Sequence, residues 1–413
     1  MGSHTEKVIE DKNMEQSFWQ KLQRVKPGDI GHFFLFLLAL PVALIYRLFR
    51  RDLWLICDNE NEARDNGYWL FRYITEKHPE QDVMYAINKK SPDYARVKNL
   101  GPVVQYGSFM HWVYYLTAAK NISSQKGGKP NAAICYVLEV YGILRNQRIF
   151  LQHGITKDDM EFLYYKHTKM RMFICAVDRE YEYVKERFGY PDGWVVNTGF
   201  CRFDNLFDTS SESKKQILVM PTWRNWIGAP TDKSYQLENI DYFTDTEYFK
   251  YWQAFLSDDR LKTILEKENI TLVFYPHREM QKFIKYFALD NERLKIAAWP
   301  EYDVQELLKE SHMLITDYSS IAMDFAYMKK PLFYYQFDYE KFRRGHYAEG
   351  YFSYENDGFG RVCRTEDDLI ENIGRCISRN WENEQMYTDR INQFFTRCDS
   401  ENSERNYGAI KGV

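Results

Sequence analysis

The chain has 413 residues, enough for two or three domains, and its 45% hydrophobic and 28% charged residues are typical of a globular protein. A net charge of −4 gives no support for nucleic-acid binding, which usually needs a strong basic excess. Seven cysteines without a CxxC pair argue against a disulfide framework or a zinc cluster and fit a reducing cytoplasm.

An apolar segment near the N-terminus, FFLFLLALPVALIY at 33–46, is followed by three arginines before residue 52. It is shorter than the ~20 residues of a membrane-spanning helix, and it contains Pro41. An apolar helix with a basic flank is typical of an interfacial anchor on an anionic leaflet. We therefore predict that 33–51 attach the protein to an anionic membrane surface. Burial against the body or in a dimer contact is the alternative, so a homo-oligomer stays open.

From residue 52 on, short apolar runs alternate with amphipathic stretches, the pattern of a mostly parallel sheet with helices on both faces. Helices are expected over 63–78 and 178–188. Strands are expected at 53–57, 82–87, 103–106, 121–124, 149–152, 172–177 and 194–198.

A polar, serine-rich stretch at 208–215 predicts a linker to a second series of the same kind. The second series has expected strands at 216–220, 271–275, 294–298, 312–316 and 331–335, with helices over 246–256, 303–310 and 319–328. The sequence thus predicts an α/β fold of two doubly wound domains, 52–207 and 208–413, after a helical segment, 1–51. Ligands of such sheets bind beyond the carboxyl ends of the strands, so we expect the site in a cleft between the domains.

Two histidines and an arginine follow expected strands. His153-Gly154 comes after 149–152. A histidine there titrates near neutral pH and can act as a general base; the alternative is a histidine that caps or hydrogen-bonds a turn. The strand at 216–220 runs into Thr222 and Arg224, whose guanidinium could grip a diphosphate or lie at a domain interface. His277 follows 271–275 and could donate to a phosphate or leaving-group oxygen.

The segment ITDYSSIAMDFAYMKKP, 315–331, gives the strongest signal for a phosphate site. Asp317 follows a strand, and Ser319-Ser320 open a helix whose free N–H groups favour an anion, although serine also caps helices. Asp324 lies one turn later and could hold a ribose or polyol hydroxyl. The chain contains no GxxxxGK[ST] loop, GxGxxG motif or Asp-x-Asp pair, which disfavours an NTPase, a nicotinamide enzyme and a metal site of that type.

These segments together resemble the signature of the CDP-glycerol glycerophosphotransferase family, which includes teichoic-acid primases, polymerases and related capsule enzymes. The resemblance covers roughly 50–345. Its landmarks, in order, are ARDNGYWLFRY (63–73), QYGSFMHW (105–112), LQHGITKD (151–158), TGFCRFDNL (198–206), MPTWR (220–224), YPHRE (275–279) and EYDVQELLKESHMLITDYSS (301–320). Cys201 and His312 depart from the residues expected there and put the subfamily in doubt.

The resemblance implies a GT-B-like pair of Rossmann-like domains, the first facing the acceptor and the second binding the nucleotide donor. It implies a peripheral protein on the cytoplasmic face of the plasma membrane. By motif, His153 becomes the base, His277 a second essential histidine, and Arg224, Ser319, Ser320 and Asp324 donor-binding residues; Thr222 and Asp317 are added for their position.

The expected reaction is attack of an acceptor hydroxyl, deprotonated by His153, on the glycerol-bearing phosphorus of CDP-glycerol with release of CMP. The acceptor is expected to be a lipid-linked teichoic-acid or capsule precursor, and no metal or other cofactor is expected. CDP-ribitol as donor, a sugar-nucleotide glycosyltransferase on the same fold, and a non-catalytic membrane scaffold are the alternatives. No role is assigned to 343–360.

Overall fold

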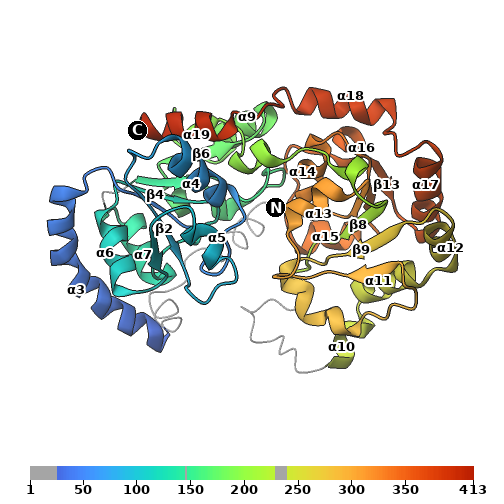
Figure 1. Cartoon of the computed structure of the whole chain (residues 1–413), viewed down its shortest axis with the longest axis horizontal. Coiled ribbons are helices and arrows are strands. Elements are labelled where there is room, and N and C mark those ends of the chain that lie inside the picture. Colours follow the sequence, from blue (N-terminus) through green and yellow to red (C-terminus); the bar gives the residue numbers. More distant parts are fainter. Residues whose placement is uncertain (1–25, 145–146, 228–239) are drawn as a thin grey trace, which may run out of the picture.

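Two lobes, each built on a parallel sheet covered by helices, lie side by side in the computed structural model (Figure 1). It describes residues 26–144, 147–227 and 240–413. The predicted α/β class with two doubly wound domains is confirmed.

The first sheet has the strand order β3-β2-β1-β4-β5-β6-β7, and every neighbouring pair is parallel. Helices on both faces bury its strands, which therefore read as short apolar runs. Its strands are β1 Trp54–Ile56, β2 Val83–Ile87, β3 Val103–Gln105, β4 Lys120–Ser123, β5 Gln147–Phe150, β6 Met172–Cys175 and β7 Val195–Asn197.

The second sheet has the order β10-β9-β8-β11-β12-β13 and is also parallel throughout. Its strands are β8 Gln216–Met220, β9 Thr271–Phe274, β10 Leu294–Ile296, β11 Met313–Thr316, β12 Leu332–Tyr335 and β13 Arg361–Cys363. The edge strand β13 was not predicted, because it has only three residues and one of them is an exposed arginine.

The helices of the first lobe are α3 Pro27–Phe49, α4 Asn66–Lys77, α5 Tyr94–Lys98, α6 Phe109–Thr117, α7 Ala132–Val140, α8 Tyr165–Thr168 and α9 Asp178–Arg187. Those that follow are α10 Ile240–Asp245, α11 Glu247–Ser257, α12 Asp259–Lys267, α13 Val304–Glu310, α14 Ile321–Tyr327, α15 Tyr339–Gly345, α16 Tyr354–Asp357, α17 Glu366–Ser378, α18 Gln385–Phe394 and α19 Asn402–Lys411. Short 3₁₀ segments are η2 Glu161–Leu163, η3 Cys201–Asn205, η4 Ser210–Glu212 and η5 Arg278–Tyr286.

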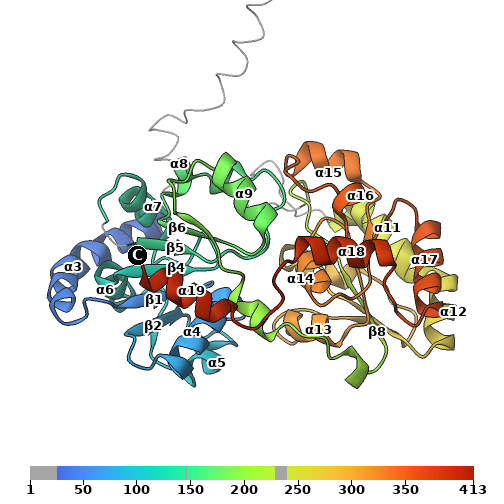
Figure 2. The same cartoon turned by 90° about the horizontal axis from the view of Figure 1, so that it is seen from above.

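The end of the chain departs from the predicted division at 207/208. Helix α18 lies on the second lobe, whereas α19 returns to the first lobe (Figure 2). There α19 packs on α4 and η3, and Lys411 pairs with Asp52. The segment 402–411 therefore belongs structurally to the first domain, although it follows the second in sequence.

Helix α3 is longer than the apolar run that predicted it, and it continues through the exposed Pro41. By length and composition the 23-residue helix could cross a membrane, which the shorter apolar run at 33–46 did not predict. In the structure it lies lengthwise on the first domain, where Trp112 donates to His32 and Arg47 donates to the carbonyl of Leu116. These contacts favour a helix that lies flat on the first domain over a helix that crosses a bilayer apart from the rest of the protein.

Candidate active site at the junction of the two domains

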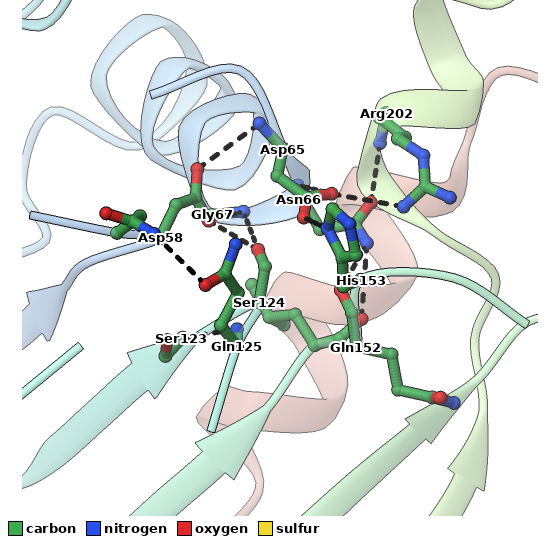
Figure 3. Close-up of polar contacts among 12 residues, drawn as sticks. Asp58, Asp65, Asn66, Gly67, Ser123, Ser124, Gln125, Gln152, His153 and Arg202 are labelled. Carbon is green, nitrogen blue, oxygen red and sulfur yellow. Dashed lines mark hydrogen bonds and ion pairs between the residues drawn. The ribbon is translucent and has the colours of Figure 1, made fainter. Parts of the chain in front are cut away.

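The loop that carries His153 begins directly after β5, which ends at Phe150, three residues before His153. Gln152 adopts a positive φ of 61°, which turns the chain sharply before His153. Its buried amide donates to Glu180 (2.9 Å), and Asn66 donates to the Gln152 carbonyl (2.8 Å; Figure 3). The buried polar contacts thus fix a strained turn and present the histidine at the sheet edge.

His153 is paired with Asp65, a residue for which the sequence predicted no role. Nδ1 of His153 lies 2.5 Å from Oδ2 of Asp65, and this pairing assigns the ring proton to Nδ1 (Figure 3). The negative charge of Asp65 raises the pKa of His153. The His153 side chain is 67% exposed, so Nε2 can accept a proton from a substrate hydroxyl.

Asp65 is held in place as the N-cap of α4. It accepts from the backbone N–H of Asn66 at 2.8 Å, and it lies 3.1 Å from the guanidinium of Arg202. Burial would raise the pKa of Asp65, but the positive charges of His153 and Arg202 outweigh burial and hold it below its ordinary value. Asp65 is therefore a charged carboxylate aimed at the histidine.

A second carboxylate, Asp58, fixes the start of α4 from the end of β1. It accepts from the backbone N–H groups of Gly67 and Tyr68, both at 2.9 Å, and from the hydroxyl of Ser124 (Figure 3). Burial, and next the charge of Asp65, raise the pKa of Asp58 to about 6. Asp58 thus anchors the helix whose first residue is capped by Asp65.

Arg202 joins this cluster to the second domain. Its guanidinium binds both carboxylate oxygens of Asp324, at 2.8 and 2.9 Å, while its remaining nitrogen contacts Asp65. The role of Asp324 in holding a ribose or polyol hydroxyl stays a prediction. Asp324 is buried and both of its oxygens are occupied by Arg202.

Ser319 and Ser320 lie against the histidine loop. A Cβ on Gly154 would come within 2.4 Å of Oγ of Ser320, so the loop and the serine pair are in close contact. Ser319 accepts from the backbone N–H of Ile321 at 3.3 Å. The structure therefore brings the predicted base and the predicted phosphate-binding serines to one place.

His277 lies close enough to His153 for the charge of His153 to affect its pKa. Its Nδ1 accepts from the backbone N–H of Glu279 at 3.2 Å, and its ring stacks beside Trp223 with centroids 6.3 Å apart. Burial, and next the positive charge of His153, lower the pKa of His277 to about 4. His277 is accordingly neutral near pH 7, and its Nε2–H is the hydrogen that can be donated to a substrate oxygen.

The role of Arg224 in binding the diphosphate of the donor stays a prediction, and in the structure its guanidinium is bound by carboxylates. Its side chain is completely buried, bound to Asp338 at 2.8 and 3.0 Å and to Asp317 at 2.9 Å. Asp317, also predicted as donor-binding, is buried by the same pair and accepts from the backbone N–H of Thr222. These charges satisfy one another and support the loop after β8. For Thr222, Oγ1 is buried and has no hydrogen-bond partner among the described residues.

The segment 343–360, without a predicted role, packs across the junction. Arg343 forms an ion pair with Asp158 (2.6 Å), and Asp159 pairs with Ala348 in an antiparallel bridge. Gly350 lies so close that a Cβ there would come within 2.3 Å of the Lys157 carbonyl. This segment therefore clamps the loop that follows His153.

The residues missed by the sequence analysis, Asp65 and Arg202, do lie inside its landmarks ARDNGYW and TGFCRFD. Asp65 falls inside the helix predicted over 63–78, whereas the observed helix begins at Asn66 and Asp65 is its cap. An arginine in a turn, such as Arg202, is common on surfaces. Only the folded chain shows that the two side chains meet beside His153.

Comparison with known proteins decides the family. The profile described as CDP-Glycerol:Poly(glycerophosphate) glycerophosphotransferase matches residues 39–412. The chain belongs to this family. It is 34% identical over 387 residues to the minor teichoic acid biosynthesis protein GgaB of Bacillus subtilis strain 168, a match that covers 91% of this chain and 41% of that protein.

More distant relatives include polymerases of two kinds. The chain is 22% identical to the teichoic acid poly(glycerol phosphate) polymerase of Bacillus subtilis strain 168 over 361 residues (78% of this chain, 44% of the relative). It is 26% identical to the teichoic acid ribitol-phosphate polymerase TarL of Staphylococcus aureus strain NCTC 8325 over 263 residues (58% and 41%). The chain thus spans less than half the length of these relatives.

The fold matches that of a solved wall teichoic acid polymerase. The wall teichoic acid polymerase TagF superimposes with a TM-score of 0.62 at 16% identity, covering 93% of this chain and 99% of that structure. A TagF variant soaked with CDPG gives a TM-score of 0.61 at 15% identity, with 93% and 98% covered. At this identity the likeness establishes the GT-B-like two-domain fold.

Proposed function

We propose that this chain transfers glycerol phosphate from CDP-glycerol to a hydroxyl group of a lipid-linked teichoic-acid or capsule acceptor. The observation that carries the proposal is the His153–Asp65 pair, which is exposed at the domain junction and in contact with the loop of Ser320. Family membership supports the reaction class, and the soaked TagF structure makes CDP-glycerol the first donor to test.

In the proposed reaction, Nε2 of His153 takes the proton of the acceptor hydroxyl while Asp65 stabilises the resulting imidazolium. The acceptor oxygen forms a bond to the glycerol-bearing phosphorus, and the bond from that phosphorus to the bridging oxygen breaks. CMP leaves with the bonding electrons. The Nε2–H of His277 and the hydroxyls of Ser319 and Ser320 would donate to phosphate oxygens as charge moves to CMP.

The test of the base is His153→Ala, with CMP release as readout. Loss of a general base is expected to lower turnover by ~10²–10⁴-fold. His167→Ala is the matched control, because His167 is a half-exposed histidine of the same domain whose side chain pairs with Glu161. A folded His153→Ala protein with turnover near that of the control would contradict the role of His153 as the general base.

CDP-ribitol is the second candidate donor, since the relatives include ribitol-phosphate as well as glycerol-phosphate polymerases. A screen of CDP-glycerol, CDP-ribitol and UDP-sugars separates the candidates. We expect CMP release from a CDP-polyol and no UDP release. UDP release alone would instead favour a sugar-nucleotide glycosyltransferase.

Metal independence remains a prediction and needs its own assay. The described part of the chain contains no group of three or more His, Cys, Asp or Glu side chains placed to hold a metal ion. Treatment with EDTA is expected to leave CMP release unchanged. A loss of activity that Mg²⁺ restores would contradict this.

Peripheral attachment to the cytoplasmic face of the plasma membrane is also part of the proposal. The exposed apolar side chains of α3 support it, because an apolar helix laid on the protein surface suits the membrane interface. Fractionation of cells into membrane and soluble parts tests it, and recovery in the soluble part alone would contradict it.

A further inference from the structure

A hollow of about 360 Å³ lies at the amino ends of two central strands of the first sheet, on the side opposite His153. Lys120 and Gln147, the first residues of β4 and β5, line it together with Arg47 and Arg51. His153, by contrast, follows the carboxyl end of β5. The hollow is thus separated from the proposed reaction site by the length of the sheet.

The described partners of the buried Lys120 ammonium group are distant: it lies 5.2 Å from the centroid of the Trp54 ring and 3.9 Å from a carboxylate oxygen of Asp52. The Lys120 side chain is only 7% exposed, and no hydrogen bond to its ammonium group is found among the described residues. Asp52 already binds Lys411 (3.0 Å) and the indole N–H of Trp54 (3.1 Å). Because both contacts of Lys120 are long, a closer anion would stabilise this buried charge further.

Arg47 and Arg51, which also line the hollow, supply further hydrogen-bond donors. Nε of Arg47 donates to the carbonyl of Leu116 at 3.0 Å, no hydrogen bond of its two terminal nitrogens is found in the described part of the chain, and Arg51 is exposed. Guanidinium groups bind phosphate oxygens in pairs, so the lining suits a phosphate group.

The hollow begins where the apolar helix α3 ends. Large apolar side chains of α3 face away from the protein; Phe34, Leu38, Leu44, Leu48 and Phe49 are 60–82% exposed. Figure 1 shows α3 on the outer side of the first lobe, away from the second lobe. An apolar surface that leads to a basic hollow matches acyl chains that lead to a charged headgroup.

We propose that Arg47, Arg51 and Lys120 form a binding site for the phosphate group of an anionic membrane lipid. The site is independent of the proposed transfer reaction. It would orient the protein on the membrane by one bound headgroup, in addition to the general attraction between basic residues and an anionic surface.

Vesicle sedimentation tests the site in the full chain. Vesicles of phosphatidylcholine with 30 mol% phosphatidylglycerol would be compared with phosphatidylcholine alone. Near an anionic surface each basic residue contributes ~1 kcal/mol, or ~5-fold in binding. We expect Arg51→Gln and Lys120→Gln each to lower binding to the anionic vesicles ~5-fold or more, with little change on neutral vesicles.

Two controls separate a site from general charge attraction. Lys267→Gln removes the same charge from the exposed surface of α12 and should leave binding unchanged. Arg51→Lys keeps the charge but loses the paired donors, so it should weaken binding by about as much as Arg51→Gln. If Arg51→Lys binds like the wild type, or if Lys267→Gln matches the site variants, no specific site exists.

Soluble ligands identify the source of the phosphate. Short-chain phosphatidylglycerol below its micelle concentration should raise the melting temperature of the wild type and not of Arg51→Gln, which keeps the buried Lys120 intact. Short-chain phosphatidylcholine should raise the melting temperature of neither protein. An equal rise with inorganic phosphate, without any effect of the variants on vesicle binding, would assign the hollow to a free anion and overturn the lipid proposal.

Discussion

Replacing Asp65 by asparagine removes the negative charge beside His153 while keeping the size of the side chain. The 2.5 Å contact to Nδ1 loses its charge assistance. An asparagine amide can also donate to Nδ1, which would leave the proton on Nε2 and remove the proton acceptor. Arg202 keeps both bonds to Asp324, so the fold at the junction should survive.

The size of the effect follows from two limits. A hydrogen bond to a charged group contributes ~1.5–3 kcal/mol, which corresponds to ~10–150-fold in rate. The same carboxylate-to-amide change beside the histidine of a serine protease lowers turnover by ~10⁴-fold through the wrong tautomer. Because the ring of His153 is two-thirds exposed and can turn in solvent, we expect a loss nearer the lower limit, ~10²-fold.

The assay is CMP release as a function of pH. A base works when deprotonated, so the wild-type rate should rise with pH through a pKa above that of an ordinary histidine. In Asp65→Asn this limb should move to lower pH, because the charge that raised the pKa is gone. Asp178→Asn is the control, since Asp178 is an exposed carboxylate of the same domain that binds Asn197. Turnover within ~2-fold of that control and an unshifted limb would refute the pairing.

Three further outcomes are expected. Arg224→Lys should lower the free energy of unfolding by ~3 kcal/mol in urea titrations, because lysine cannot satisfy the two buried carboxylates; unchanged stability with a raised KM for the donor would support the donor role. Gly154→Ala should reduce turnover without changing the melting temperature, since its Cβ would displace Ser320; full activity would contradict the contact. Burial lowers the pKa of His111 to about 3, so the folded state takes up its proton less readily than the unfolded state between that value and the ordinary 6.5. Stability should therefore fall as pH decreases through this window by up to ~1.4 kcal/mol per pH unit, and His111→Gln should remove this part of the slope.

The strands were readable because burial on both faces leaves continuous apolar runs. The segment 216–220 is predicted and observed with the same bounds, and 331–335 differs by one residue. The strand before His153 was placed two residues too late, at 149–152. Gln152 looked like a strand end, but its positive φ and the bonds of its side chain to a buried glutamate belong to a turn.

The charged residues of the site were harder to assign from sequence. Arg224, Asp317 and Asp324 stand where ligand-binding side chains often stand, after strands or in the first turn of a helix. A sequence does not show whether such a charge faces a ligand or another charge. Here the partner of Arg224 is Asp338, and that of Asp324 is Arg202, each more than 100 positions away in the chain.

The two arginine clusters differ in a way that bears on catalysis. Arg224 is enclosed by carboxylates of its own domain, Asp317 and Asp338. Arg202 binds Asp324 of the second domain while it contacts Asp65 of the first, and its charge lowers the pKa of His153 that Asp65 raises. The proton affinity of His153 therefore depends on contacts from both domains, and neither domain alone contains the complete site.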